Sequence, residues 1–130
     1  MPTAQSLQAT KKGMVINMNI QIFGSGKCFD TKKAERYFKE RGVRFQSIDL
    51  VKFGISKGEF TSVKQAVGGV EKLLNPEAKD KDLLAMMQYL SPEDKEAKLL
   101  ENPKLFRTPI VRNGKKATVG FAPEVWKNWD

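Results

Sequence analysis

The residue with the clearest chemical potential is Cys28, the single cysteine in a chain of 130 residues that has no histidine. These two counts exclude an internal disulfide, an intact CxxC redox pair, a zinc site built from several cysteines and histidines, and any acid–base mechanism that needs an imidazole. No metal site is expected. The chemistry that remains for Cys28 is nucleophilic attack by its thiolate.

Cys28 follows the loop Gly24-Ser25-Gly26 and comes just before a predicted helix. A helix N-terminus offers the positive end of the macrodipole and unpaired N–H groups, and both favour thiolate over thiol. The two glycines allow the backbone to fold closely around an anion. The surroundings are also basic, with Lys27, Lys32, Lys33 and Arg36. This context predicts a lowered pKa; the alternative, an inert cysteine packed like a small hydrophobe, stays open.

The second feature is the tripeptide Arg107-Thr108-Pro109, which comes directly before a predicted strand. A proline removes a hydrogen-bond donor from a sheet, so it marks the first residue of a strand or an exposed edge, and its peptide bond is a candidate for the cis form. Two interpretations stay open. The segment is either a simple strand start or a turn that lines a site beside the thiol.

The elements around Cys28 predict a β-α-β unit. The run MNIQIF at 18–23 has the composition of a strand, and DTKKAERYFKER at 30–41 has apolar residues at helical spacing with Gly42 as the stop. The segment 43–50 is rich in β-formers and predicts a second strand, parallel to the first. Cys28 should then lie in the connecting loop or in the first turn of the helix.

Helices are predicted next. Ser56 and Glu59 spell a capping box that begins a helix through about Val67, residues 80–90 form a short helix, and Ser91 with Pro92 begins another. Together they make a helical block over 56–102.

The chain then returns to strands. Residues 108–112 and 115–119 are predicted as a hairpin, with Asn113-Gly114 at the centre of a type I′ turn. Pro123 begins a last helix over 122–129 that presents Val125 or Trp126, and Trp129, to the core.

The net charge of +8 is unevenly distributed. Residues 1–17 carry +2, 18–60 carry +4, 61–104 carry −1 and 105–130 carry +3. The polar segment 1–17 is predicted to be a disordered extension, and 18–130 to be one folded domain. Basic residues near the first helix alternate with Glu35 and Glu40, which is typical of a solvated face, so direct nucleic-acid binding is the weakest interpretation. No run of apolar residues is long enough for a membrane span or a signal peptide, and a cytoplasmic location is expected.

The order of elements predicts an α/β class, a thioredoxin-like fold with a mixed β-sheet and a helical insertion at about 56–104. Over residues 19–129 the chain resembles the arsenate reductase (ArsC)/Spx/YffB family. The resemblance rests on the GxGKC loop, Lys32-Lys33-Ala34, Glu101-Asn102-Pro103, Leu105-Phe106, Pro109-Ile110-Val111 and Val119-Gly120-Phe121-Ala122-Pro123-Glu124. It implies a protein that reduces arsenate, acts as a glutathione-dependent thiol reductase, or binds RNA polymerase as Spx regulators do.

The chain departs from both better-known branches of this family. Glutaredoxin-coupled arsenate reductases hold the oxyanion with three arginines, and the matching positions here carry Asn75, Thr108 and Ala122, with Arg107 displaced by one residue. Spx regulators carry a CxxC switch, and Thr31 occupies the place of its second cysteine. Any disulfide of Cys28 must therefore form with an external thiol.

These observations lead to one hypothesis with one alternative. Cys28 is the predicted nucleophile of a monothiol reductase, with no bound cofactor and with glutathione or a redox partner protein supplying the second thiol. Thr31 is predicted to hydrogen-bond the thiolate, Lys27 to lower its pKa, and Arg107, Thr108 and Pro109 to shape the substrate site. The alternative is a non-enzymatic regulator that binds RNA polymerase, and arsenate reduction ranks below both.

Overall fold

The computed structural model describes residues 19–129, so the extension expected at 1–17 lies outside the described residues. The elements in chain order are β1 (Ile20–Gly24), α1 (Phe29–Glu40), β2 (Phe45–Asp49), α2 (Leu50–Phe53), α3 (Lys57–Val67), η1 (Val70–Leu73), α4 (Lys81–Met87), α5 (Pro92–Glu101), η2 (Pro103–Leu105), β3 (Ile110–Asn113), β4 (Lys116–Val119) and α6 (Pro123–Trp126), where η denotes a 3₁₀ helix.

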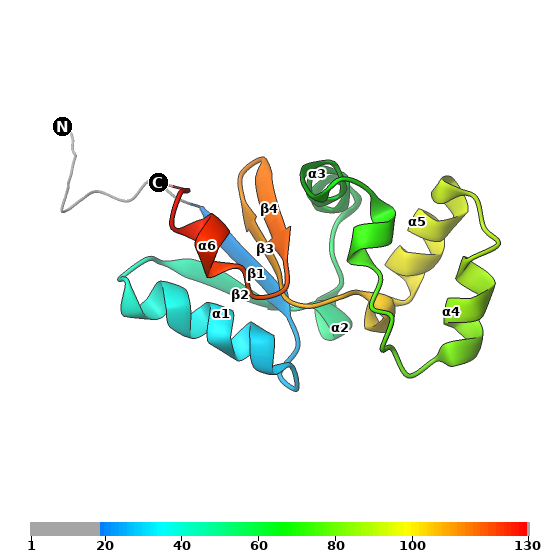
Figure 1. Ribbon diagram of the computed structural model, residues 1–130, viewed down its shortest axis with the longest axis horizontal. Coiled ribbons are helices and arrows are strands. Elements are labelled where there is room, and N and C mark those ends of the chain that lie inside the picture. Colours follow the sequence, from blue (N-terminus) through cyan, green and yellow to red (C-terminus); the bar gives the residue numbers. More distant parts are fainter. Residues whose placement is uncertain (1–18, 130) are drawn as a thin grey trace.

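The four strands form one mixed sheet in the order β2-β1-β3-β4. β1 runs parallel to β2, with Ile22 beside Ser47, and antiparallel to β3, with Ile22 beside Val111. β3 and β4 form an antiparallel hairpin. The expected α/β, thioredoxin-like fold with a mixed sheet and a helical insertion is confirmed (Figure 1).

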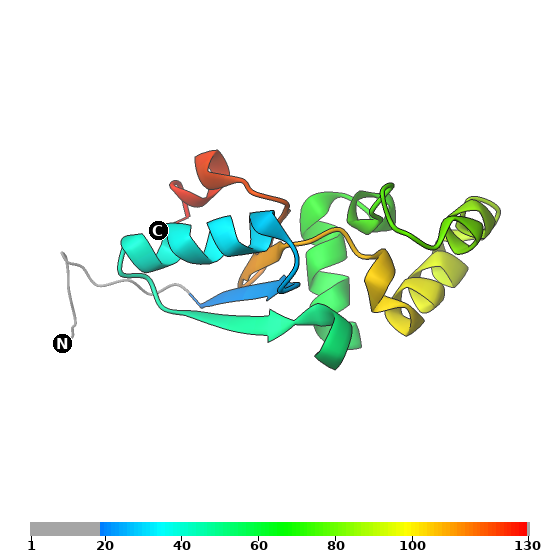
Figure 2. The same ribbon diagram turned by 90° about the horizontal axis from the view of Figure 1, so that it is seen from below.

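The sheet separates two apolar cores because successive strand residues face opposite sides. Ile20 and Ile22 of β1 face α1 and α6 and join a cluster that includes Phe38 and Trp126. Phe23 faces the other side, where its cluster contains residues of α3 and of the helical insertion. Figure 2 shows α1 and α6 together on one side of the sheet, with α3 crossing its end and α4 and α5 beyond it.

Two helices of the insertion, α3 and α5, begin at the predicted N-caps. The Ser56 side chain accepts a hydrogen bond from the Glu59 N–H, and the Glu59 carboxylate accepts one from the Ser56 N–H, so the capping box is complete. Ser91 accepts from the Asp94 N–H at the start of α5. No helix within residues 19–129 is both long enough and apolar enough to cross a membrane.

Two local predictions were wrong in detail, and one helix was not predicted. The hairpin pairs Asn113 with Lys116, so the turn residues are Gly114 and Lys115 rather than Asn113 and Gly114. Helix α2 follows β2 directly and was not predicted, although Asp49 caps it by accepting from the Lys52 N–H at 3.1 Å. The last helix is limited to Pro123–Trp126, where Ala122 has a non-helical φ of −133°.

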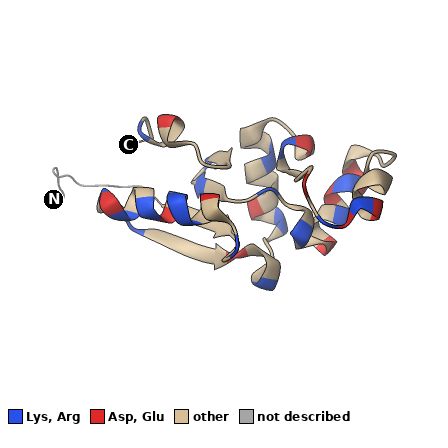
Figure 3. Cartoon of the chain, turned by 60° about the horizontal axis from the view of Figure 1, so that its bottom comes forward, with Lys and Arg blue, Asp and Glu red and all other residues tan. Residues whose placement is uncertain are grey.

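Charged residues do not form a single-sign face on α1. Figure 3 shows its Lys and Arg residues interspersed with Asp and Glu, as the alternation in the sequence indicated. Lys33 and Asp30 approach within 4.0 Å, and the Ser47 hydroxyl of β2 donates to the Glu35 carboxylate at 2.5 Å. This arrangement is that of a solvated helix surface.

Glu59 gives the fold a sensitivity to acid. Burial alone raises its pKa, but hydrogen bonds from Ser56 and Gln21 and the nearby positive charge of Arg112 lower the pKa overall. A carboxyl whose pKa is lower in the folded state stabilises the protein above its unfolded pKa, about 4.3, and this stabilisation is lost as the pH falls through the folded pKa. We expect Glu59→Gln to lower the free energy of unfolding at pH 7 by about 0.3–1 kcal/mol, and the difference from wild type to vanish in acid.

Urea unfolding at a series of pH values measures this difference. Glu40→Gln, at the exposed end of α1, is the matched control because it removes the same charge away from the capping box. A difference between wild type and Glu59→Gln that stays constant from neutral to acidic pH would contradict the prediction.

Candidate active site

Cys28 is the N-cap residue of α1 and is half-buried. Its N–H donates to the Ser25 carbonyl at 3.0 Å, which closes the turn after β1, and its own carbonyl accepts from the Lys32 N–H at 3.3 Å. The thiol therefore lies where the chain turns from the end of β1 into the helix. This placement agrees with the position expected from the sequence.

The segment before β3 lies against the thiol. Phe23 of β1 pairs with Ile110 of β3, so the residues preceding β3 lie beside the loop that follows β1. The Thr108–Pro109 peptide bond is cis. The Cys28 thiol donates to the Thr108 carbonyl with a sulfur–oxygen distance of 3.6 Å, across 80 positions of sequence. The turn interpretation of this tripeptide is the one that the geometry supports.

The pKa of Cys28 is lowered from its ordinary value. Burial alone raises the pKa, but hydrogen bonds from the side chains of Thr108 and Thr31 and from the backbone of Thr31 and Asp30 outweigh it. Hydrogen-bond donors of this kind favour the thiolate, because the negatively charged sulfur is a stronger acceptor than the sulfur of the neutral thiol. The Lys27 ammonium is not among these causes.

Among the buried residues within 19–129, Thr31 is the one that belongs to the polar residue types, and it is 5% exposed. Its hydroxyl accepts from the Ser25 N–H at 3.3 Å, so it fixes the loop as well as approaching the sulfur. Gly24 packs directly on it: a Cβ on Gly24 would lie 2.5 Å from Thr31 Oγ1. The glycine is therefore required for this close helix–strand approach, whereas Gly26 has open space around it.

We expect Gly24→Ala to destabilise the fold by about 1–3 kcal/mol, because the added methyl overlaps a buried side chain that has little room to move. Gly26→Ala adds the same methyl two residues away and should leave the free energy of unfolding within about 0.5 kcal/mol of wild type. Urea midpoints of the two variants provide the comparison. Equal midpoints would show that Thr31 can move aside without cost.

The remaining predicted residues are placed differently. Lys27 is exposed, and its N–H donates to Ser25 Oγ at 3.3 Å. Arg107 lines a cavity formed with η1, α4 and α5, and no hydrogen bond joins it to Cys28 in the described part of the chain. Its N–H donates to the Leu73 carbonyl at 2.7 Å. Within residues 19–129 the structure brings together Cys28, Thr31 and Thr108, while Lys27 and Arg107 lie outside this group.

Two residues next to Cys28 at the start of α1 were not singled out from the sequence. The Asp30 backbone helps to lower the Cys28 pKa, and its position in the first turn of a helix was the available signal. Phe29, the residue that follows Cys28, is 80% exposed, which no periodicity argument predicts. Among residues 19–129 no group of His, Cys, Asp and Glu side chains is arranged to hold a metal ion.

The fold and its single thiol beside a cis-proline turn place the protein in the thioredoxin-like class. The model of the ArsC family matches residues 23–129, which is most of the chain, and the protein therefore belongs to the ArsC family. The resemblance inferred from the sequence motifs is confirmed.

Two relatives of this chain match it over most of its length. The chain is 26% identical over 107 residues to the global transcriptional regulator Spx 2 of Oceanobacillus iheyensis, a match that spans 80% of this chain and 78% of the regulator. It is 23% identical over 117 residues to the uncharacterized protein YusI of Bacillus subtilis, spanning 86% of this chain and 99% of that protein.

Solved structures support the fold. An ArsC-family related protein of Bacteroides fragilis superposes with a TM-score of 0.78 at 23% identity, over 88% of this chain and all of that one. An arsenate reductase of Vibrio cholerae superposes with a TM-score of 0.73 at 24% identity, over 83% of this chain and 94% of that one. At these identities the likeness establishes the shared fold, and the activity must be argued from the residues.

Proposed function

We propose that the protein is a monothiol thiol–disulfide reductase that uses the Cys28 thiolate together with an external thiol such as glutathione. The observation that carries this proposal is the set of donors around the sulfur, from Thr31, Thr108 and the first turn of α1, which lowers its pKa. A structural cysteine needs no such arrangement. Reduced thiols are maintained in the cytoplasm, which is the location that this reaction requires.

The reaction proceeds in two exchanges. The Cys28 thiolate attacks one sulfur of a disulfide substrate, a new S–S bond forms between Cys28 and that sulfur, and the other sulfur leaves as a thiolate. A glutathione thiolate then attacks the substrate sulfur of this mixed disulfide, and Cys28 leaves as a thiolate. Across the two exchanges, one substrate sulfur is released as a thiolate and the other ends joined to glutathione as a disulfide. When the substrate is a mixed disulfide with glutathione and Cys28 attacks the glutathione sulfur, the products are the free substrate thiol and oxidised glutathione.

The protein's own residues serve both exchanges. Thr31 and the N–H groups of the first turn stabilise the attacking and the leaving thiolate of Cys28. Because position 31 carries threonine rather than cysteine, no second thiol within the sequence can resolve the mixed disulfide. The external thiol is thus a required co-substrate in this proposal.

Alkylation of Cys28 by iodoacetamide as a function of pH tests the activated thiol. Since the Cys28 pKa is lowered, the midpoint of the rate profile should fall below the ordinary thiol value of about 8.5. Thr31→Val removes one donor while keeping the shape of the side chain, so its midpoint should rise relative to wild type. Thr31→Ser keeps the hydroxyl and is the control. A wild-type midpoint at or above about 8.5 would sink the proposal.

A second candidate is a regulator that binds RNA polymerase, and the observation that favours it is the likeness to Spx 2 over most of the chain. Affinity capture with RNA polymerase as the target tests it directly, with Cys28→Ser alongside the wild type. Capture of both the wild type and Cys28→Ser by RNA polymerase would favour the regulator. Arsenate reduction has less support, since Asn75, Thr108 and Ala122 stand where that branch carries arginines.

A further inference from the structure

Two exposed phenyl side chains belong to the segments that adjoin the candidate active site. Phe29 follows Cys28 in the chain and is 80% exposed, and Phe121 is 40% exposed. Side chains of this size are usually buried, and exposed aromatic groups are enriched where proteins bind one another. Neither ring has a part in the two thiol exchanges. What they share is their position around the thiol.

Phe29 is the first residue of α1, and Cys28 is its N-cap. The Cα atoms of adjacent residues are about 3.8 Å apart, and the Cα–Cβ bonds of a helix tilt toward its N-terminus. The Phe29 side chain therefore extends from the end of α1 at which Cys28 lies. Because it is 80% exposed, it is a projecting group and not the wall of an enclosed pocket.

Phe121 is connected to the thiol through the turn at Thr108 and Pro109. The Cys28 thiol donates to the Thr108 carbonyl at 3.6 Å, and the Gly120 N–H donates to the Pro109 carbonyl at 2.8 Å. Figures 1 and 2 both show the segment between β4 and α6 passing the N-terminal turns of α1. Phe121 thus follows a residue that is hydrogen-bonded to the turn in contact with the thiol.

Lys33 connects the segments that carry the two rings. It lies four residues after Phe29, on the same face of α1, and its ammonium group is 5.7 Å from the centroid of the Phe121 ring. Phe121 also packs edge-to-face on Trp126, with ring centroids 5.5 Å apart. Its ring is therefore held from two sides while part of it stays exposed. Phe29, Lys33 and Phe121 together form an aromatic rim next to Cys28.

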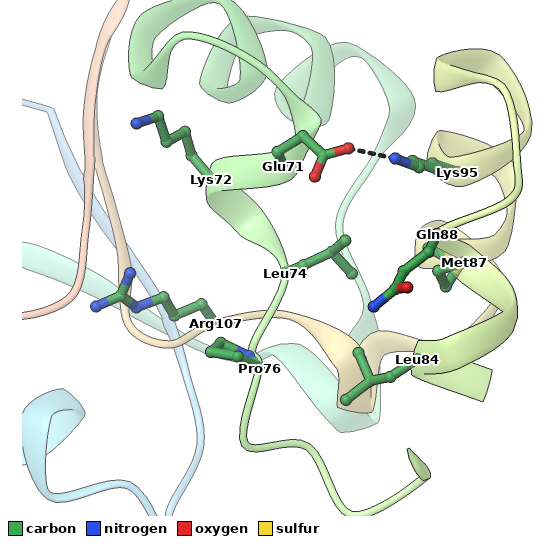
Figure 4. Close-up of a pocket in the computed structure, with 9 residues that line it drawn as sticks. All are labelled: Glu71, Lys72, Leu74, Pro76, Leu84, Met87, Gln88, Lys95 and Arg107. Atoms are coloured by element: carbon green, nitrogen blue, oxygen red, sulfur yellow. Dashed lines mark hydrogen bonds and ion pairs between the residues drawn. The ribbon is translucent and has the colours of Figure 1, made fainter. Parts of the chain in front are cut away.

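The surface toward the helical insertion is different. Arg107, at the start of the turn, and Lys72 of η1 are both exposed, and Figure 4 shows their charged ends directed away from Leu74 and Leu84. The depression drawn in Figure 4 does not include Cys28 or any residue of the aromatic rim among its lining residues. The aromatic rim is thus a separate feature on the α1 side of the turn.

Thiol–disulfide exchange brings the substrate against this rim. The thiolate attacks along the S–S bond, so the leaving sulfur points away from Cys28, and the groups next to the attacked sulfur lie on the surface around it. Small ligands favour concave pockets that enclose most of their surface. Projecting aromatic side chains are instead typical anchors of contacts between polypeptides. The aromatic rim therefore fits a polypeptide disulfide better than a small-molecule disulfide.

We propose that the disulfide attacked by Cys28 belongs to a polypeptide, and that Phe29 and Phe121 select one in which an aromatic or large aliphatic side chain adjoins the cysteine. This inference rests on the proposed reductase function and names its substrate class. In this step Cys28 forms an S–S bond with the cysteine sulfur of the substrate, and the other sulfur leaves as a thiolate. Contact with the rim removes apolar surface from water during the attack, which raises its rate.

Two peptides that differ only next to their cysteine test the proposal. They are acetyl-Gly-Cys-Phe-Gly-amide and acetyl-Gly-Cys-Ser-Gly-amide, each as its mixed disulfide with 2-nitro-5-thiobenzoate. Attack by Cys28 on the peptide sulfur releases the coloured thiobenzoate and leaves the peptide on the protein, where mass spectrometry detects it. Each rate is divided by the rate of the same peptide with N-acetylcysteine, which corrects for intrinsic reactivity. We expect the full chain to prefer the phenylalanine peptide by about fivefold or more.

Variants locate the source of this preference. Phe29→Ala and Phe121→Ala should each reduce it by about twofold or more, while Tyr89→Ala, which removes an 87% exposed ring from the insertion, is the matched control and should keep it. The iodoacetamide midpoint of each variant should stay at the wild-type value, which separates selection of the substrate from a change in the thiol. Because Phe121 also packs on Trp126, urea unfolding checks that variant, and Phe29→Ala decides alone if Phe121→Ala does not fold.

The outcomes distinguish this inference from the reductase function on which it rests. If Cys28 forms an adduct with neither peptide, both are overturned. If it forms both adducts at equal corrected rates, the substrate class is overturned and the reductase function stands. The same holds if Phe29→Ala keeps the wild-type preference, or if Tyr89→Ala loses as much of it as Phe29→Ala does.

Discussion

Cys28→Ser is expected to reduce disulfide-reductase turnover to background, a loss of about 10³-fold or more, and to eliminate the mixed disulfide with glutathione. Serine keeps the size of the side chain and the hydrogen bond to the Thr108 carbonyl, but its hydroxyl is not ionised at neutral pH. The first exchange then has no nucleophile, and the chain has no second cysteine to replace it. The assay is glutathione-dependent reduction of a small mixed disulfide, with mass spectrometry of the intact protein.

The same variant separates the two candidate functions. The urea midpoint of Cys28→Ser should match that of wild type, so loss of turnover reports on chemistry rather than on folding. A regulator that acts by docking alone would retain its capture of RNA polymerase in this variant. Residual turnover or a persisting glutathione adduct in Cys28→Ser would place the reactive group elsewhere and contradict the reductase proposal.

Local signals in the sequence predicted the helices of the insertion well. Ser56 with Glu59 and Ser91 with Asp94 are pairs three residues apart, and each cap is satisfied within its own turn. Such contacts need no information from distant parts of the chain. The same reasoning placed Cys28 at the start of α1, since the apolar spacing of that helix and the glycines before it are both local.

The contacts that define the candidate site are not local. The Thr108 carbonyl reaches Cys28 because β1 pairs with β3, and the register of that pairing is set by which faces of both strands are buried. Arg107, one residue before Thr108, is held at η1 by the hydrogen bond from its N–H to the Leu73 carbonyl at 2.7 Å. The sequence left two interpretations of the tripeptide 107–109 open, a strand start or a turn beside the thiol, and only the tertiary structure selects between them.

Gly24 illustrates a residue whose importance was foreseen for a different reason. The sequence suggested that the glycines allow the loop to close around an anion. In the structure the space that a Gly24 side chain would need is filled by Thr31, so the requirement comes from packing within the protein. The sequence shows where a glycine is required, but only the fold shows which side chain fills the space next to it.

The second large effect is expected from Trp126→Ala, which should lower the free energy of unfolding by about 3–5 kcal/mol. Trp126 is 2% exposed and lies at the centre of an aromatic cluster, with ring centroids 5.1 Å from Tyr37, 5.1 Å from Phe38 and 5.5 Å from Phe121. Its indole N–H donates to Thr118 Oγ1 at 2.7 Å. The side chain therefore joins α6 to both α1 and β4.

Two further variants divide this effect into its parts. Trp126→Phe keeps a ring in the cluster and removes the donor to Thr118, so it should cost about 1–2 kcal/mol, while Val125→Ala, at a 40% exposed neighbour, should cost under about 0.5 kcal/mol. Urea unfolding of the three variants gives the order of their losses in free energy of unfolding. Since small folds have only about 5–15 kcal/mol in total, Trp126→Ala should leave the protein close to unfolding at 37 °C. A cost for Trp126→Ala no larger than that for Val125→Ala would mean that α6 does not stabilise the sheet and α1.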